Sequence, residues 1–179
     1  MNFSSSLVRA RVPFGWALGV AALFLARPTM TSYLVGLVIA ALGEVWRAWA
    51  SGHLIKWKGL TRGGPYAWTR NPLYFGSLLI GVGFSVASAR WEVGLLFVGF
   101  VVGVYLPVIR AEAARLARQY PEDYPDYARR VPLLLPRSPR GRRPLGEEAF
   151  DWRRFLENRE HVTLLGWLAG ALLLGLRMR

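Results

Sequence analysis

The chain has 179 residues, no Cys, a formal net charge of +12 and a mean hydropathy of +0.25. This length allows one compact domain, and the lack of Cys excludes disulfides, thiolate nucleophiles and Cys-ligated metals. Two His residues leave little scope for a His-based site, so we expect no metal. Hydrophobic residues make up 53% of the chain and gather in long runs, which indicates an integral membrane protein.

The sequence contains five apolar runs of roughly 15–20 residues, the length of membrane-spanning helices. They are Val12–Ala26, Thr31–Ala50, Pro72–Ala89, Glu92–Ile109 and His161–Leu176. No clear small-x-small cleavage site follows the first run, so a helical hairpin is favoured over a secretory signal. We predict an all-α membrane protein of about five transmembrane helices, with a cytoplasmic helical segment between spans four and five.

Basic residues lie mainly on one side of this arrangement. That side carries Arg9, Arg11, Lys56, Lys58, Arg62, Arg70 and the basic residues of 110–159, and the other carries Arg27, Arg90, Arg177 and Arg179. The positive-inside rule then places the N-terminus in the cytoplasm and the C-terminus outside. We expect the basic loop 137–143 to lie near anionic headgroups. It has no aromatic residue to stack on bases, so we expect no nucleic-acid partner.

We predict a single domain, residues 1–179, in three parts. Residues 1–50 form an N-terminal helical hairpin, 51–136 a central core, and 137–179 a basic loop, an amphipathic helix and the last span. In the core, a helical period predicts that span four continues over 109–120 and ends at Pro121. Residues 124–131 predict a short helix that ends at Pro132, and residues 151–159 predict an amphipathic surface helix.

Span two contains two charged residues, Glu44 and Arg47. Intramembrane charges are costly and usually face a partner or a cavity. The i,i+3 spacing lets these two pair on one helix face. They are either a structural pair near the membrane surface or a cavity-lining pair in which Arg47 offers a fork for an anionic group.

The segment 63–77 is rich in Gly, Pro and aromatic residues and runs into the third span. Such backbone cannot face lipid, so it is either an interfacial loop or the wall of a buried site. Pro72 suits the first turn of a helix and puts Asn71 at the N-cap, its side chain free to accept a backbone N–H. The free N–H groups of this helix start suit a ligand carboxylate. Gly76 allows close approach of a ligand or a neighbouring helix.

Further polar residues follow span four. Glu112 lies on an Ala-rich helix, where a carboxylate is most often solvated. Tyr120, Tyr124 and Tyr127 come next, and they form either an interfacial belt or a cover over a cofactor. The triplet 158–160, at the start of span five, either caps a cavity or pairs with neighbouring residues, and pairing is favoured.

Taken in order, these motifs resemble those of the integral-membrane methyltransferases. That family includes isoprenylcysteine carboxyl methyltransferases and phospholipid N-methyltransferases. The matching motifs are Gly64-Pro65-Tyr66, Arg70-Asn71-Pro72-x-Tyr74-x-Gly76, Glu112-x-x-x-Leu116 and Tyr124-x-x-Tyr127-x-x-x-Val131-Pro132. Each motif is weak alone, whereas their order and spacing are specific. The resemblance covers roughly Gly43 to Pro136.

The resemblance implies an S-adenosylmethionine-dependent methyltransferase whose cofactor-binding core is residues 51–136. Its acceptor would be lipophilic and membrane-embedded, with a carboxylate or a lipid headgroup at the cytoplasmic face. The implied cofactor-binding residues are Gly64, Pro65, Tyr66, Arg70, Asn71, Pro72, Tyr74, Glu112, Tyr124 and Tyr127, the last two closing the pocket. The catalytic candidates are Glu112 and Arg130, and the substrate-binding candidates are Arg47, His53 and Arg130.

The chain departs from the family pattern at three places. Asn71 stands where His is usual, and Asn does not titrate near neutral pH, so a proton-transfer role there is in doubt. Ala113 replaces a second acidic residue, and Tyr120-Pro121 replaces Phe-Gly. The run Arg47-x-Trp49-Ala50-x-Gly52-His53 resembles a bacterial branch of the family, which suggests the bacterial inner membrane.

The acceptor chemistry stays open at this point. A carboxylate needs no base, whereas an amine needs one, such as Glu112 or His53. The excess of Arg over bases mildly favours a carboxylate or an anionic headgroup.

Two other functions compete with methyl transfer. One is a membrane reductase that uses NADPH, because sterol reductases have a similar Arg-x-Pro-x-Tyr segment. The other is a non-enzymatic membrane protein. The oligomeric state is not indicated.

Overall fold

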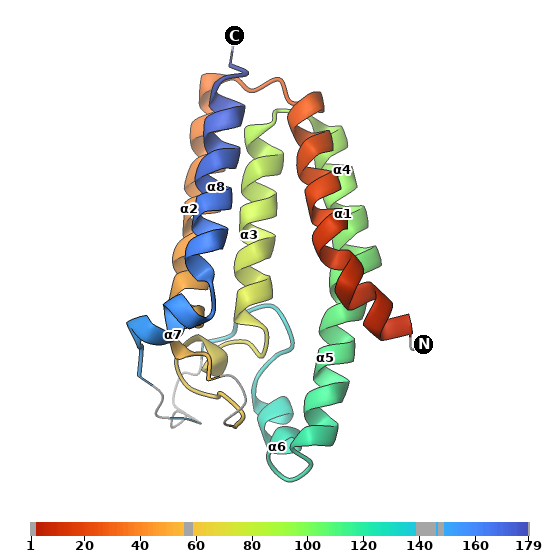
Figure 1. Cartoon of the computed structure of the whole chain (residues 1–179), viewed down its shortest axis with the longest axis vertical. Coiled ribbons are helices and arrows are strands. Elements are labelled where there is room, and N and C mark those ends of the chain that lie inside the picture. The colour runs from red at the N-terminus through yellow and green to blue at the C-terminus, as the bar shows by residue number, and fades with distance from the viewer. Residues whose placement is uncertain (1–2, 56–58, 139–145, 147–148, 179) are drawn as a thin grey trace.

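The computed structural model describes residues 3–55, 59–138, 146 and 149–178, and all regular secondary structure within them is helical. The long helices are α1 (Phe3–Leu25), α2 (Met30–His53), α3 (Pro72–Ala87), α4 (Trp91–Phe100), α5 (Leu106–Gln119) and α8 (Glu160–Gly175). They run along the long axis of the molecule, with α4 and α5 as one continuous rod (Figure 1). Each of the five predicted apolar runs lies in one of these rods.

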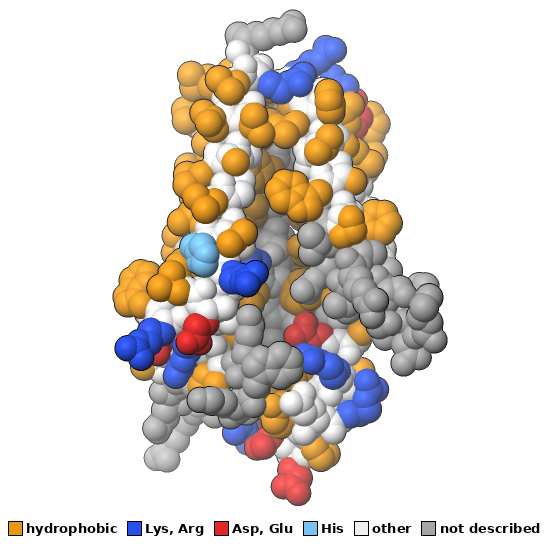
Figure 2. Space-filling model, viewed as in Figure 1, with side chains coloured by type: hydrophobic (Ala, Val, Ile, Leu, Met, Phe, Trp, Pro, Cys, Tyr) orange, Lys and Arg blue, Asp and Glu red, His pale blue; other side chains and the backbone are white. Residues whose placement is uncertain are grey.

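Two of these rods are long and apolar enough to cross a membrane by length and composition, Met30–His53 and Trp91–Gln119. The remaining apolar helices are shorter, over Pro13–Leu25, Pro72–Ala87 and Glu160–Gly175. Hydrophobic side chains cover the upper part of one face, and charged side chains gather mostly at its lower end (Figure 2). An apolar outer surface of this size is typical of a protein that associates with a membrane.

The two ends of the bundle differ in kind. At one end, called here the turn end, the α1–α2 and α3–α4 connections meet near the C-terminus (Figure 1). The backbone N–H of Arg27 donates to the Ser88 carbonyl there, at 2.9 Å. The other end, called here the polar end, holds the 3₁₀ helix η1 (Gly64–Ala67), α6 (Asp123–Arg130) and α7 (Trp152–Glu157).

α2 and α3 form the closest helix pair, and small residues make their contact. A Cβ added to Gly83 would lie 2.5 Å from both the Ala40 nitrogen and the Gly36 oxygen. One at Gly76 would lie 2.8 Å from the Gly43 oxygen. The two backbones therefore touch directly, as in membrane helices with small residues at the interface. This confirms that Gly76 allows the close approach of a neighbouring helix.

The rod after the α3–α4 turn contains a π-helical stretch, η2 (Val101–Tyr105), between α4 and α5. The Tyr105 ring contacts the Tyr74 ring of α3 edge-on, with centroids 5.3 Å apart. Beyond it, α5 extends to Gln119, which confirms the predicted continuation of span four and its end before Pro121. The predicted short helix after it is α6, and it ends one residue before Val131.

The predicted surface helix is α7, and it is shorter than expected. Asp151 caps it by accepting the Arg153 backbone N–H at 2.8 Å. Trp152 and Leu156 are exposed, which suits a helix at a membrane surface. Arg159, with φ of 57°, then turns the chain into α8. Lys56, Lys58 and most of the basic loop 137–143 lie outside the described residues.

Candidate functional site

The loop between α2 and α3 forms one wall of the candidate site. Gly64 has φ of +54°, a conformation that favours glycine. A Cβ there would also lie 2.6 Å from Nε2 of the buried His53. Nδ1 of His53 lies 2.9 Å from the Trp49 carbonyl oxygen, which holds the ring. Two constraints, one on backbone conformation and one on space, therefore require glycine at position 64.

The segment after α6 supports this loop from behind. The Arg70 backbone N–H donates to the Pro132 carbonyl at 2.9 Å. The buried Thr69 hydroxyl donates to the Leu134 carbonyl at 2.9 Å. Asn71 Nδ2 donates to the Leu133 carbonyl, also at 2.9 Å. These contacts fix residues 69–71 against residues 132–134 and make the wall a single rigid unit.

Asn71 occupies the N-cap of α3 as predicted, but its side chain does not cap the helix. Its amide is turned toward Leu133 instead, because that carbonyl lies within reach of a buried donor. The expectation that the side chain accepts a backbone N–H was wrong. Pro72 is fully buried in the first turn, where its missing N–H costs nothing.

Two buried tyrosines of α6 close the polar end against the loop. The Tyr127 hydroxyl donates to the Tyr66 carbonyl at 2.8 Å. Arg70 Nη1 donates to the Tyr124 hydroxyl at 2.9 Å, and its guanidinium carbon lies 5.6 Å from the centre of that ring. Tyr124 and Tyr127 are 5% and 2% exposed. They therefore belong to the packed interior of this end rather than to an interfacial belt.

Tyr66 is a buried residue of the loop, and the groups around it influence its hydroxyl. Burial raises the pKa of its hydroxyl well above the usual value, with further contributions from Tyr127 and Glu112. The hydroxyl therefore stays neutral at physiological pH. The helix that bears Glu112 packs against this region, since Ala113, Leu116 and Ala117 of α5 contact the cluster of Tyr124, Tyr127 and Val131. Glu112 itself is partly exposed and lies 3.8 Å from Arg115.

Arg47 uses all five of its N–H donors within the chain. Nε and Nη2 donate to the two carboxylate oxygens of Glu160 at 2.6 and 3.0 Å. Nη1 donates to the Leu73 carbonyl at 3.0 Å and to Ser77 Oγ at 2.6 Å. The last donor reaches Thr163 Oγ1 at 3.3 Å.

The partner of Arg47 is therefore Glu160 on α8, not Glu44 on its own helix. The pairing of Glu44 with Arg47 was wrong, because a carboxylate on a facing helix can accept both parallel N–H bonds of the guanidinium. Pairing of the 158–160 triplet is confirmed, since Asn158 Nδ2 also donates to the Ser51 carbonyl at 2.9 Å. The Glu44 Oε1 atom is buried and has no hydrogen-bond partner in the part of the chain that the structure describes.

Arg130 lies on the exposed side of α6. Its Nη2 is 2.9 Å from Asp126 Oδ2, and Arg129 binds the other oxygen of that carboxylate at 3.3 Å. Desolvation is the largest single influence and raises the pKa of Asp126, but the hydrogen bonds and charges of the two arginines together outweigh it and hold the pKa below its usual value. The pair therefore persists at neutral pH, and Arg130 stands at the rim of the polar end.

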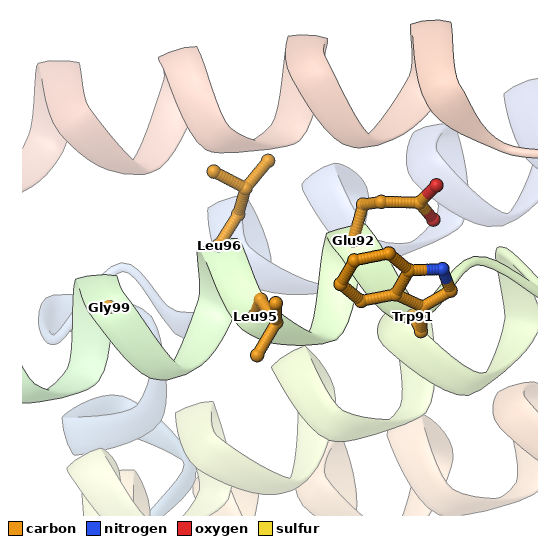
Figure 3. Close-up of a pocket in the computed structure, with 5 residues that line it drawn as sticks. All are labelled: Trp91, Glu92, Leu95, Leu96 and Gly99. Carbon is orange, nitrogen blue, oxygen red and sulfur yellow. The ribbon is translucent and has the colours of Figure 1, made fainter.

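Two features outside this region complete the description. A surface groove of about 540 Å³ lies on α4 at the turn end, lined by Trp91, Glu92, Leu95, Leu96 and Gly99 (Figure 3). Its lining is mostly apolar and lies at the opposite end from the loop, so it does not belong to the candidate site. No group of three or more His, Asp or Glu side chains that could hold a metal ion occurs within the described residues.

Sequence reasoning predicted that the triplet 158–160 pairs, but it did not identify Arg47 as the partner of Glu160. A carboxylate at the edge of an apolar run is a signal of a buried partner. Ser77 and Thr163 gave no signal, because single hydroxyls within apolar helices are common. The support of the loop by residues 132–134 was also missed, since a turn of Pro and Leu has no pattern that identifies its contacts.

Known proteins resemble the region just described. The sequence model of the phospholipid methyltransferase family matches residues 16–123. The nickel-cobalt-cadmium resistance protein NccN of Alcaligenes xylosoxydans xylosoxydans is 35% identical over 111 residues, which cover 60% of this chain and 50% of that protein. The cobalt-zinc-cadmium resistance protein CzcN of Cupriavidus metallidurans is 36% identical over 110 residues, covering 60% and 49%.

The chain thus spans about half the length of these two curated relatives. No solved structure matches it. The family match takes in α2, the loop, α3 and the whole α4–α5 rod, and it ends at Asp123, the first residue of α6. Because it covers more than half of the sequence, it shows that this chain belongs to the phospholipid methyltransferase family.

Proposed function

We propose that this protein is an S-adenosylmethionine-dependent methyltransferase acting on a lipophilic, membrane-embedded acceptor at the cytoplasmic face of the membrane. One observation carries the proposal: the loop 63–72, the tyrosines of α6 and the α5 helix that bears Glu112 pack together at the polar end. They are far apart in sequence, and they are the segments in which the chain resembles membrane methyltransferases.

Three features of this end fit a ligand with an anionic and a cationic part. Arg70 Nε is buried without a hydrogen-bond partner among the described residues. The first turn of α3 has no side-chain cap, and the positive end of a helix favours an anion. Glu112 supplies a partly exposed carboxylate for a cationic or hydroxyl group.

In this proposal the cofactor is held by Gly64, Pro65, Tyr66, Arg70, Asn71, Pro72, Tyr74, Glu112, Tyr124 and Tyr127. When bound, S-adenosylmethionine supplies an electrophilic methyl group on a sulfonium. Arg70 and the start of α3 bind the anionic part, and Glu112 binds the amino or ribose groups. Tyr124 and Tyr127 fix the loop and exclude water, so the protein contributes mainly by positioning.

The acceptor is proposed to approach from the lipid, between helices, with its tail in apolar surroundings. Arg130 at the rim, His53 behind Gly64 and the Arg47 region are the proposed acceptor-side residues. Arg130 is the most exposed of these three side chains, and it is the one proposed to orient an anionic group. Arg47 can do so only by giving up bonds to Glu160 or α3.

We also propose that all five rods cross the membrane, with the polar end and the N-terminus in the cytoplasm. The bacterial inner membrane is the proposed location. The short helices α3 and α8 would span through local thinning of the bilayer or little tilt. The charge asymmetry of the sequence supports this orientation. Fusion of a reporter to each terminus tests it, and a cytoplasmic C-terminus would overturn it.

The test of the function compares two ligands in detergent. Thermal stability is measured with S-adenosylhomocysteine and with NADPH, because a ligand that binds the folded state raises the melting temperature at saturation. We expect a shift with S-adenosylhomocysteine alone. A shift with NADPH alone would favour the membrane reductase, and no shift with either would favour a non-enzymatic protein.

The role of Glu112 is tested in the same assay. We expect Glu112→Ala to reduce the stabilisation by S-adenosylhomocysteine, because the carboxylate partner of the ligand is lost. Glu122→Ala, at an exposed position of the same polar end, is the matched control and should retain it. If S-adenosylhomocysteine stabilises both variants equally, Glu112 does not bind the ligand.

A further inference from the structure

α7 has an apolar face and a charged face, and both are exposed. Trp152 and Leu156 lie about one turn apart and are 71% and 57% exposed. Arg153 and Glu157, also about one turn apart, are exposed on the other face. α7 lies where the apolar surface of the bundle gives way to its charged lower end (Figures 1 and 2). A helix of this kind at this level suits the headgroup region of a bilayer.

The free charge of α7 and of the corner that follows it is mainly positive. Arg153 and Arg159 are exposed and have no ion-pair partner among the described residues. Arg154, by contrast, lies 3.9 Å from Asp151. Basic side chains at this level attract the anionic phospholipids of the cytoplasmic leaflet, which the polar end is proposed to face. We call the exposed apolar and basic side chains together the α7 surface: Trp152, Arg153, Leu156 and Arg159.

Hydrogen bonds fix both ends of α7 to the end of α2. The Asp151 backbone N–H donates to the Gly52 carbonyl at 3.0 Å. Asn158 Nδ2 donates to the Ser51 and Leu54 carbonyls at 2.9 and 3.3 Å. The last carbonyls of a helix have no partner within that helix, so the α7 segment supplies their donors from outside. The position of α7 and that of the α2 end are therefore linked.

Aromatic contacts continue from α7 to the loop of the candidate site. The Trp152 ring meets the Phe150 ring edge-on, with centroids 4.9 Å apart, and the Phe150 and His53 centroids are 6.0 Å apart. A Cβ on Gly52 would overlap the Phe150 ring. His53 in turn fills the space that a side chain at Gly64 would need. A continuous series of packed side chains thus runs from the exposed Trp152 to the loop 63–72.

We propose that the α7 surface binds the anionic phospholipid headgroups of the bilayer, and that this contact stabilises the loop 63–72 through Phe150 and His53. Lipid that holds α7 also restricts the end of α2, which leaves the loop fewer open conformations. A ligand that needs the ordered loop then loses less conformational entropy on binding. The coupling rests on the proposed function only for the identity of that ligand, the cofactor.

The test uses the full chain in nanodiscs that hold one copy each, so that a second copy cannot cover the α7 surface. One set of discs contains phosphatidylcholine, and the other contains an equal mixture of phosphatidylcholine and phosphatidylglycerol. Hydrogen exchange with mass spectrometry measures the local opening of α7 and of the loop, with no ligand added. We expect both segments to exchange about 5-fold more slowly in the anionic discs at low salt, the effect of about one basic residue at an anionic surface.

Three variants separate lipid binding from coupling. Arg153→Gln should remove much of the lipid dependence of both segments. Arg118→Gln, at an exposed position near the end of α5, loses the same charge and should retain that dependence. Phe150→Leu keeps an apolar side chain but removes the ring. Its α7 should still respond to the anionic lipid, whereas its loop should not.

Equal exchange of the wild-type loop in the two lipid mixtures would overturn the inference. The same holds if Arg153→Gln keeps as much lipid dependence as Arg118→Gln. A loop in Phe150→Leu that responds as strongly as the wild-type loop would rule out coupling through that ring. Circular dichroism shows whether each variant is folded. If Phe150→Leu does not fold, the wild-type comparison and the surface variant Arg153→Gln still decide.

The failure of this inference differs from that of the proposed function. Stabilisation by S-adenosylhomocysteine is measured in the same two sets of discs, and we expect it to be larger in the anionic ones. Its absence in both, with a loop that still responds to the lipid, argues against the methyltransferase alone. Equal stabilisation in both, with unchanged loop exchange, argues against the α7 coupling alone.

Discussion

α2 contacts two neighbours in different ways. Against α3 it presents Gly36, Ala40 and Gly43, and the two backbones touch with no room for a side chain. Against α8 it presents Tyr33 and Arg47, and the contacts are hydrogen bonds and one ion pair among the described residues. The first interface depends on shape and the second on polar groups.

The difference indicates which interface can admit a ligand. Backbone contact between α2 and α3 leaves no space for a side chain, so that pair is the fixed frame of the bundle. α8 is exposed to its surroundings along most of its outer face and is held at separate points. A molecule that enters from the lipid would therefore pass beside α8 rather than between α2 and α3.

The largest expected effect comes from the ion pair of the polar interface. Glu160→Ala leaves Arg47 buried without its counter-charge, which typically costs about 3–5 kcal/mol in free energy of unfolding. Denaturant titration in detergent measures it. Glu157→Ala, three residues away and exposed, is the control. The double variant Arg47→Met, Glu160→Met should recover much of the lost free energy of unfolding, because it removes both charges. No recovery would show that the pair stabilises the fold by more than charge neutralisation.

The next effect tests the shape-dependent interface. Gly83→Ala places a methyl group 2.5 Å from backbone atoms of α2, which must separate the helices. We expect a loss of about 2–3 kcal/mol, in the upper range for overpacking. Gly94→Ala, whose Cβ would meet nothing within 4 Å, should be neutral or slightly stabilising. Equal melting temperatures for the two variants would contradict the direct backbone contact.

A smaller effect is expected from a single hydrogen bond between α6 and the loop. Tyr127→Phe leaves the Tyr66 carbonyl without its donor, at a cost of about 1–2 kcal/mol for a buried hydrogen bond. Weaker stabilisation by S-adenosylhomocysteine should accompany it, since the loop is less firmly held. Tyr120→Phe, whose hydroxyl accepts a hydrogen bond from the exposed Gln119 side chain, is the control. If S-adenosylhomocysteine stabilises Tyr127→Phe as much as the wild type, α6 does not contribute to ligand binding.

The smallest effect on stability is expected at the rim. Arg130→Ala removes one of two partners of Asp126 and should change the free energy of unfolding by less than about 1 kcal/mol, as for exposed pairs. If Arg130 orients the acceptor, methyl transfer falls while stability does not. Arg129→Ala is the matched control, and equal activity of both variants would remove Arg130 from the acceptor side.

Much of the fold followed from the sequence, because helix ends have local causes. Pro72 begins α3, α5 ends ahead of Pro121, and apolar runs of sufficient length form the rods. The pairing of Arg47 did not follow, because Glu160 is 113 residues away and only the packing of α8 brings it near. The Asn71 amide likewise turned to a carbonyl that only the folded chain provides.

The π-helical stretch η2 has a geometric consequence for the rod that contains it. An α-helix turns by about 100° per residue, so the wider turn of Val101–Tyr105 offsets α5 relative to α4. The face of α5 that bears Glu112 is therefore rotated from the direction that an unbroken continuation of α4 would give it. A one-residue deletion within η2 would keep the rod continuous but rotate α5 about its axis. Glu112 would then point away from Tyr66.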